Sequence, residues 1–279
     1  MTKVAAGIVK AIAGGGPVAG FRMLIPQMIP AMHEPLMQEL TSPPSVRFPI
    51  ADMAPPKAVA GGNLFIPISL GNHYYSSDVL RRVLADFIAP SRQSVIFLCD
   101  RLRLLSYRIR GETDLERIGA NIRLQLSELT RSLMHLGLRA HPNAVVADWS
   151  LLASDPRHDR LLAVLEGLVC GDPVLCRKLD EYARELMQRF RGSDGRSGRD
   201  SMALQRQYVL EETALSLYMT EVRGCNVEVY RRGMGFVDDL YRERPAALLT
   251  LTGKSKLERE FISIEAWLAG QLADTTPVP

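Results

Sequence analysis

The chain has 279 residues, of which 47% are hydrophobic and 23% charged, and its formal net charge is +3. This composition is typical of a folded globular protein and excludes a largely disordered chain. The length allows one large or two small domains, which can fold without disulfides or a structural metal. Four cysteines form no C-x-x-C pair and no zinc-like spacing with histidine, so we expect reduced thiols, no metal and a cytoplasmic location.

The amino-terminal segment reads as an extension outside the folded domain. Lys10 and Arg22 interrupt every apolar window of the about 20 residues that a membrane helix needs. Lys10 also lies inside the apolar core that a signal peptide would require. We therefore predict no membrane association. The expected organisation is a partly flexible extension over 1–58, a single domain over 59–270 and a tail over 271–279.

Strands and helices are predicted to alternate after the extension. Short apolar runs rich in β-branched and aromatic residues indicate buried parallel strands. Apolar residues three or four positions apart indicate amphipathic helices. The predicted strands are 64–70, 94–100, 143–149, 226–230 and 260–264; the predicted helices follow a Ser76 cap and span 113–136, 157–169, 173–191 and 201–222, with a mobile loop over 192–199. The pattern predicts an α/β fold with a mainly parallel central sheet flanked by helices, whose ligands bind beyond the carboxyl ends of the strands.

Ser69 ends the first predicted strand, two residues before Gly71 and ahead of a helix. That arrangement lifts a serine hydroxyl above a parallel sheet, as in the nucleophile elbow of hydrolases. The elbow needs glycine where this chain has Pro67, and a hydrolase also needs a general-base histidine. A serine esterase or amidase and a serine that merely closes a turn both stay open as alternatives.

Two later segments carry further candidate groups. Tyr208 and Glu212 are four residues apart on one helix, so they share a face with Leu215 beside it. A phenol and a carboxylate that converge can hold a substrate ammonium or take a proton from it. In the strand 227–230, alternation places Glu228 and Tyr230 on one face. Both sets could equally face solvent.

In order and spacing, these segments resemble the cyclodipeptide synthases. The resemblance rests on Ser69-x-x-Asn72-x-Tyr74-x-Ser76, then Tyr208-x-x-x-Glu212, then Tyr230, and covers roughly residues 60–270. It implies a Rossmann-like three-layer fold, similar to the catalytic domain of class I tyrosyl- and tryptophanyl-tRNA synthetases but without their ATP-binding signatures. Two residues depart from the family pattern: Pro67 replaces a glycine, and Arg231 replaces the histidine or proline that usually follows the late tyrosine.

The resemblance implies an aminoacyltransferase that needs no cofactor, does not bind DNA, and converts two aminoacyl-tRNAs to a cyclic dipeptide, a 2,5-diketopiperazine, for later tailoring enzymes. Ser69 would carry the first aminoacyl group in a ping-pong mechanism. Tyr208 and Glu212 would anchor its amino group, Asn72 would fix the serine turn, and Tyr230 would relay protons.

The resemblance also implies a pocket for the first amino acid, lined by Phe65, Pro67, Phe97, Trp149, Leu215 and Glu228. A carboxylate among apolar groups is costly unless it has a partner. The partner of Glu228 would be either a donor-bearing substrate side chain, such as His, Trp, Arg or Lys, or an arginine of the protein. Arg231 is the less favoured arginine, because alternation points it to the opposite face of the strand. The second case would leave the pocket apolar in effect.

A tRNA substrate requires contacts to phosphates. Eight arginines and four acidic residues lie between positions 101 and 139, a net charge of +4. Arg117, Arg123 and Arg131 are the candidates for tRNA binding, although a solvated helix face would show the same pattern. A non-catalytic tRNA-binding module is the third functional class left open.

Overall fold

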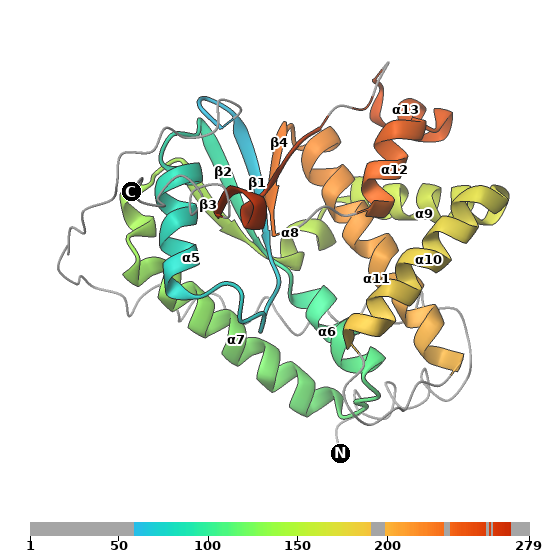
Figure 1. Cartoon of the computed structure of the whole chain (residues 1–279), viewed down its shortest axis with the longest axis horizontal. Coiled ribbons are helices and arrows are strands. Elements are labelled where there is room, and N and C mark those ends of the chain that lie inside the picture. Colours follow the sequence, from blue (N-terminus) through green and yellow to red (C-terminus); the bar gives the residue numbers. More distant parts are fainter. Residues whose placement is uncertain (1–58, 191–198, 232–234, 255–256, 258, 269–279) are drawn as a thin grey trace, which may run out of the picture.

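The computed structural model describes residues 59–190, 199–231, 235–254, 257 and 259–268 of the chain. Five strands form one parallel sheet in the order β3-β2-β1-β4-β5. The strands are β1 (Asn63–Ile68), β2 (Gln93–Leu98), β3 (Ala144–Ala147), β4 (Val227–Tyr230) and β5 (Glu260–Ser263). Helices cover both faces of the sheet, so the molecule has the three layers of a Rossmann-like fold (Figure 1).

The sheet has a topological switch point between β1 and β4. The chain moves outward from β1 through β2 to β3, then returns to the other side of β1 with β4 and β5. The helices that follow β1 and β4 cover opposite faces of the sheet. In open α/β sheets, ligands generally bind at the carboxyl ends of the strands beside such a switch point. Phe65 of β1 lies beside Glu228 of β4 in the register, so the two strands end close to one another.

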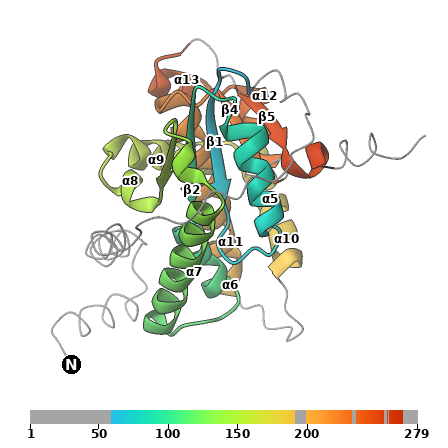
Figure 2. The same cartoon turned by 90° about the vertical axis from the view of Figure 1, so that its left-hand side faces the viewer.

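One face of the sheet is covered by helices from the first half of the chain. These are α5 (Ser77–Arg82), the π-helical η2 (Val83–Ile88) and α7 (Leu115–His135). Their apolar side chains pack against the sheet side chains that point to this face, such as Ile66, Ile96 and Val229. In the turned view, α5 and α7 lie in front of the sheet and α10 and α11 behind it (Figure 2).

The opposite face is covered by helices that lie mostly in the second half of the chain. Phe65 and Phe97 point to this side, where α11 packs against α6, α9 and α10. The helices are α6 (Asp100–Ile109), α8 (Trp149–Ala153), α9 (Pro156–Gly171), α10 (Pro173–Phe190), α11 (Arg199–Leu217) with η4 (Tyr218–Val222), α12 (Gly235–Glu243) and α13 (Ala246–Thr252). Because Phe65 and Glu228 are neighbours in the register, Glu228 faces the α11 layer.

The predicted α/β architecture is confirmed, with shifts at several element ends. The five predicted strands are present, but the third ends at Ala147, and Trp149 begins α8 because Asp148 caps that helix through its own carboxylate. The sequence pattern did not predict α6, α8, α12 or α13. Ser76 caps α5 as expected, its hydroxyl accepting from the Val79 amide. The predicted extension, most of the predicted loop and the tail lie outside the described residues.

Candidate active site

The turn after β1 presents Ser69 at the carboxyl edge of the sheet. Gly71 has a φ of 66°, a left-handed conformation that a residue with a side chain rarely adopts. The Asn72 amide donates to the Ser69 carbonyl over 3.3 Å, and the Asn72 side-chain oxygen accepts from the Tyr74 amide over 3.1 Å. Asn72 therefore braces the turn from both its backbone and its side chain.

Three side chains from three elements meet at the switch point. The Ser69 Oγ lies 2.8 Å from the Tyr230 hydroxyl at the end of β4. The Tyr230 hydroxyl in turn donates to Glu212 Oε1 on α11 over 3.3 Å. Tyr230 is in contact with both partners and is set between them, so a proton leaving Ser69 has a continuous hydrogen-bonded route to a carboxylate.

Tyr208 lies one helical turn before Glu212 on α11 and is buried, with 7% of its surface exposed. Burial raises the pKa of Tyr208 well above its ordinary value, and the Glu212 charge raises it further. Burial and the same carboxylate also raise the pKa of Tyr230. Both phenols therefore stay protonated at neutral pH, and Tyr230 donates to Glu212.

Four of the apolar residues expected to line the first-residue pocket, Phe65, Phe97, Trp149 and Leu215, belong to one buried cluster. The Phe65 and Phe97 rings meet edge to face at 6.3 Å between centroids, and Phe97 and Trp149 at 5.7 Å. Leu215 belongs to the same core, and Pro67 of β1 is buried. Although Trp149 lies on a helix instead of a strand, it contacts the cluster that the sequence assigned to it.

Glu228 has its partner within the protein. Its Oε2 accepts from Ser216 Oγ over 2.7 Å and pairs with Arg259 over 2.8 Å, while Oε1 has no hydrogen-bond partner among the described residues. Glu228 is fully buried, and this burial raises the pKa of its carboxyl group although Arg259 opposes the shift. Arg231, which the sequence offered as a less favoured partner, pairs with Glu265 instead.

Two members of this cluster were missed by the sequence analysis. Ser216 follows Tyr208 and Glu212 at a further four-residue interval, so the helical spacing alone could have placed it on the same face. Arg259 lies just before β5, and its guanidinium also contacts Asp238 and lies over the Tyr241 and Phe261 rings. No local sequence pattern connects Arg259 to Glu228, because their contact depends on the pairing of β4 with β5.

The arginine-rich segment is divided between two helices. Arg117, Arg123 and Arg131 are exposed on α7, which is the second helix after β2 and not the first. Arg101 of α6 is turned inward, where it pairs with the buried Glu211 over 2.5 Å. The segment therefore offers fewer surface cations than its composition suggests.

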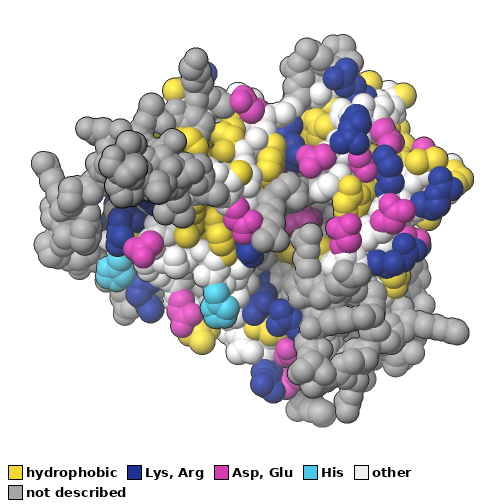
Figure 3. Space-filling model, viewed as in Figure 1, with side chains coloured by type: hydrophobic (Ala, Val, Ile, Leu, Met, Phe, Trp, Pro, Cys, Tyr) yellow, Lys and Arg dark blue, Asp and Glu magenta, His cyan; other side chains and the backbone are white. Residues whose placement is uncertain are grey.

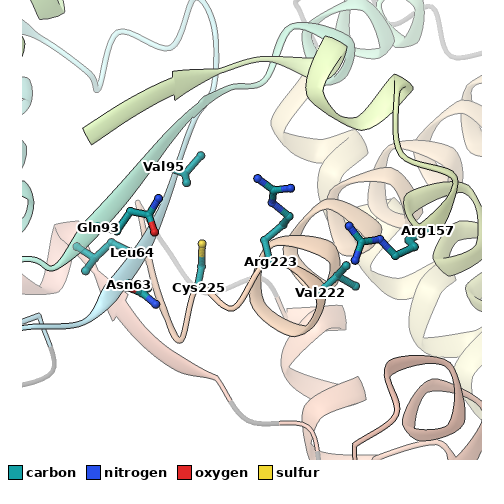
Figure 4. A pocket seen from close by; sticks show the side chains of 8 residues that line it. All are labelled: Asn63, Leu64, Gln93, Val95, Arg157, Val222, Arg223 and Cys225. Carbon is teal, nitrogen blue, oxygen red and sulfur yellow. The ribbon is translucent and has the colours of Figure 1, made fainter. Parts of the chain in front are cut away.

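A cavity of about 240 Å³ lies at the amino ends of β1 and β2, away from Ser69 (Figure 4). Asn63, Gln93, Arg157, Arg223 and Cys225 are among its lining residues. Because ligands of parallel sheets bind at the carboxyl ends of strands, this cavity is not the candidate active site. Among the described residues, no group of three His, Cys, Asp or Glu side chains could hold a metal ion, and no helix combines the length and apolarity needed to cross a bilayer.

Comparison with known proteins identifies the fold. No protein-family model and no curated protein matches the chain. Among solved structures, AlbC, a cyclodipeptide synthase from Streptomyces noursei, is 15% identical with a TM-score of 0.56, over 76% of this chain and 99% of that chain. The chain has the cyclodipeptide synthase fold.

Two further structures give the same result. A cyclodipeptide synthase from Fluoribacter dumoffii is 15% identical with a TM-score of 0.59, over 74% of this chain and 91% of that chain. A Mycobacterium tuberculosis protein, whose structure relates cyclodipeptide synthetases to type I tRNA synthetases, is 16% identical with a TM-score of 0.57, over 73% of this chain and 84% of that chain. The fold relationship expected from the three sequence segments is thereby confirmed.

Proposed function

We propose that the chain is a cyclodipeptide synthase, an aminoacyltransferase that joins two aminoacyl-tRNAs into a 2,5-diketopiperazine. The observation that carries this proposal is the hydrogen-bonded series Ser69–Tyr230–Glu212 at the switch point of the sheet. It combines a nucleophile, a proton relay and a carboxylate within a fold that the solved cyclodipeptide synthases share. A covalent aminoacyl-Ser69 intermediate, formed before the second aminoacyl-tRNA reacts, would make the reaction a ping-pong transfer.

In the first step, Ser69 Oγ attacks the ester carbonyl of an aminoacyl-tRNA. A new ester forms between the aminoacyl group and Ser69, and the bond to the ribose oxygen of the tRNA breaks. The proton of Ser69 moves toward Tyr230, and the departing ribose oxygen gains a proton. Tyr208 and Glu212 hold the ammonium of the bound residue, since the carboxylate offers charge and the phenol fixes orientation.

The amine of the second aminoacyl-tRNA then attacks the acyl-enzyme: an amide bond forms, the Ser69 ester bond breaks, and Ser69 regains a proton as the amine loses one. The dipeptide is now esterified to the second tRNA. Its free amine attacks that ester, which closes the diketopiperazine ring and releases the second tRNA, whose ribose oxygen takes up a proton.

The hydrolase alternative has less support. A serine hydrolase positions its nucleophile by a hydrogen bond to histidine. The described hydrogen-bond partner of the Ser69 hydroxyl is the Tyr230 phenol, whereas His158 packs edge to face between Trp149 and Tyr218.

Expression in a bacterium, followed by mass spectrometry of the culture medium, tests the proposed function. We expect diketopiperazines from the wild type and none from Ser69→Ala, which also loses the mass increment of the acyl-enzyme. Ser77→Ala, an exposed serine on α5, is the matched control and keeps full production. Wild-type enzyme that releases free amino acids from esters but makes no diketopiperazine would support the hydrolase instead.

The ion pair of Glu228 bears on the identity of the first amino acid. Because Arg259 already neutralises this carboxylate, we infer that the pocket is apolar in effect and that it accepts a flat or aliphatic side chain. Purified enzyme offered Leu-, Phe-, His-, Trp-, Arg- and Lys-tRNA separately should form the acyl-enzyme fastest with Leu or Phe. Preferential loading of a cationic residue would mean that the unpartnered Glu228 Oε1 recognises the substrate.

A further inference from the structure

Arg231 follows Tyr230 directly and departs from the pattern of the family that the chain resembles. Its guanidinium carbon lies 4.6 Å from the centre of the Tyr74 ring, and its Nε donates to Glu265 Oε1 over 2.6 Å. The side chains of Arg231 and Glu265 are 34% and 28% exposed, so both are partly desolvated. Arg231 therefore joins the end of β4 to a residue of the turn that carries Ser69.

Tyr74 is an integral part of that turn. Its amide donates to the Asn72 side chain, and its ring meets the Tyr75 ring edge to face at 5.4 Å between centroids. The Tyr75 hydroxyl donates to the carbonyl of Pro67, two residues before Ser69. Tyr74 is therefore connected to the chain on both sides of Ser69, through Asn72 after it and through Tyr75 and Pro67 before it.

The backbone of Arg231 is fixed to β5 and to the residues that follow it. The Arg231 carbonyl accepts from Ser263 Oγ over 3.0 Å and from the Glu265 amide over 3.3 Å. With its backbone and guanidinium both anchored, Arg231 has little freedom to follow a movement of Tyr74. The carboxyl end of β4 thus contacts the turn through two adjacent residues: Tyr230 contacts Ser69, and Arg231 contacts Tyr74.

We propose that Arg231 is a positioning residue that holds the Ser69 turn at the distance from Tyr230 needed for acyl transfer. This inference rests on the proposed function. In the contacts described, the Arg231 side chain touches neither Ser69 nor the Glu212 carboxylate. It acts through Tyr74. Its planar guanidinium can stack on the ring and donate to Glu265 at once, which the ammonium of lysine cannot reproduce.

Single-turnover acylation of Ser69 at increasing aminoacyl-tRNA concentration measures this role. We expect Arg231→Met and Tyr74→Leu each to lower the maximal acylation rate about three- to thirtyfold, in line with the loss of a partly desolvated cation–π contact. Tyr74→Phe keeps the ring and should react faster than Tyr74→Leu, and Arg231→Lys should give a rate between those of the wild type and Arg231→Met. The tRNA concentration for half-maximal rate and the thermal midpoint should change little, because nucleophile position and not substrate binding is altered.

The double variant Arg231→Met/Tyr74→Leu should be no slower than the worse single variant, since both changes remove one contact. Arg160→Met, an exposed arginine on α9, is the matched control and should react at the wild-type rate. If Arg231→Met does not fold, Tyr74→Leu and Glu265→Gln report on the same contact from its other members.

The outcomes separate this inference from the proposed function. Wild-type enzyme that forms no aminoacyl ester would overturn the proposed function. A wild type that forms the ester, together with Arg231→Met and Tyr74→Leu at the wild-type rate, would overturn only the positioning role. Strictly multiplicative effects of the two substitutions would also overturn it, because independent residues show no coupling.

Discussion

Glu212 is linked to the nucleophile through Tyr230, and its charge also acts on the buried phenol of Tyr208. In the proposed reaction it supplies the negative charge for the substrate ammonium. Removing one charge-assisted partner in a desolvated site costs about 1.5–3 kcal/mol, which is roughly ten- to a hundredfold in rate. We therefore expect Glu212→Gln to slow acyl-enzyme formation by that factor.

Rapid-quench measurement of the acyl-enzyme tests this prediction. Glu181→Gln, an exposed glutamate on α10, provides the matched control with an unchanged rate. A Glu212→Gln enzyme that acylates as fast as the control would assign Glu212 a structural role only.

At the scale of elements, the junctions after β2 and β3 bring two aspartates together. Asp100 begins α6, its Oδ1 accepts from the Trp149 amide over 3.2 Å, and Asp148 caps α8 nearby. Burial, reinforced by the Asp148 charge, raises the pKa of Asp100 from 3.8 to about 7. The folded state thus retains a proton that the unfolded chain has released.

The free energy of unfolding should therefore fall as pH rises from about 4 to about 7, because the unfolded state loses its proton first. Asp100→Asn keeps the acceptor for Trp149 and removes the ionisation. We expect this variant to lack that part of the pH dependence and to be more stable than the wild type at pH 8. Urea unfolding at several pH values checks this, and parallel curves for the two proteins would contradict it.

The sequence could predict those elements whose signals are local. Apolar runs and helical spacing predicted all five strands and the long helices. The three spaced segments named Ser69, Glu212 and Tyr230, which the fold brings into one hydrogen-bonded series. The sequence did not predict α6, because arginines interrupt its short apolar face, which consists of Leu102, Leu105 and Ile109. Contacts such as Glu228–Arg259 and Arg231–Tyr74 depend on strand order and a turn, which no local pattern encodes.

On the face of the molecule shown in Figure 3, side chains of both charge signs are mixed over α9, α10, α12 and α13. If Arg117 and Arg123 of α7 bind tRNA phosphates, Arg117→Glu with Arg123→Glu should weaken tRNA binding at least tenfold. The same pair should lower the salt dependence of binding, because fewer counterions are released.

Filter binding of aminoacyl-tRNA at several salt concentrations measures both effects. Arg160→Glu with Arg177→Glu, two exposed arginines on α9 and α10, removes the same net charge elsewhere. If the two pairs weaken tRNA binding equally, α7 contributes only through general electrostatic attraction and not through specific phosphate contacts.

Gly71 also links the Ser69 turn to the helix that carries these arginines. A Cβ atom at position 71 would lie 2.6 Å from the Arg103 guanidinium and 3.1 Å from the Gln125 amide of α7. Arg103 and Gln125 hydrogen-bond to one another and to the Tyr107 hydroxyl, which makes them a firm surface under the turn. At Gly71, the Ser69 turn thus lies directly against side chains of α6 and α7. If α7 binds tRNA and Ser69 is the nucleophile, the short span between them sets how far the 3′ end of the tRNA must extend from the helix.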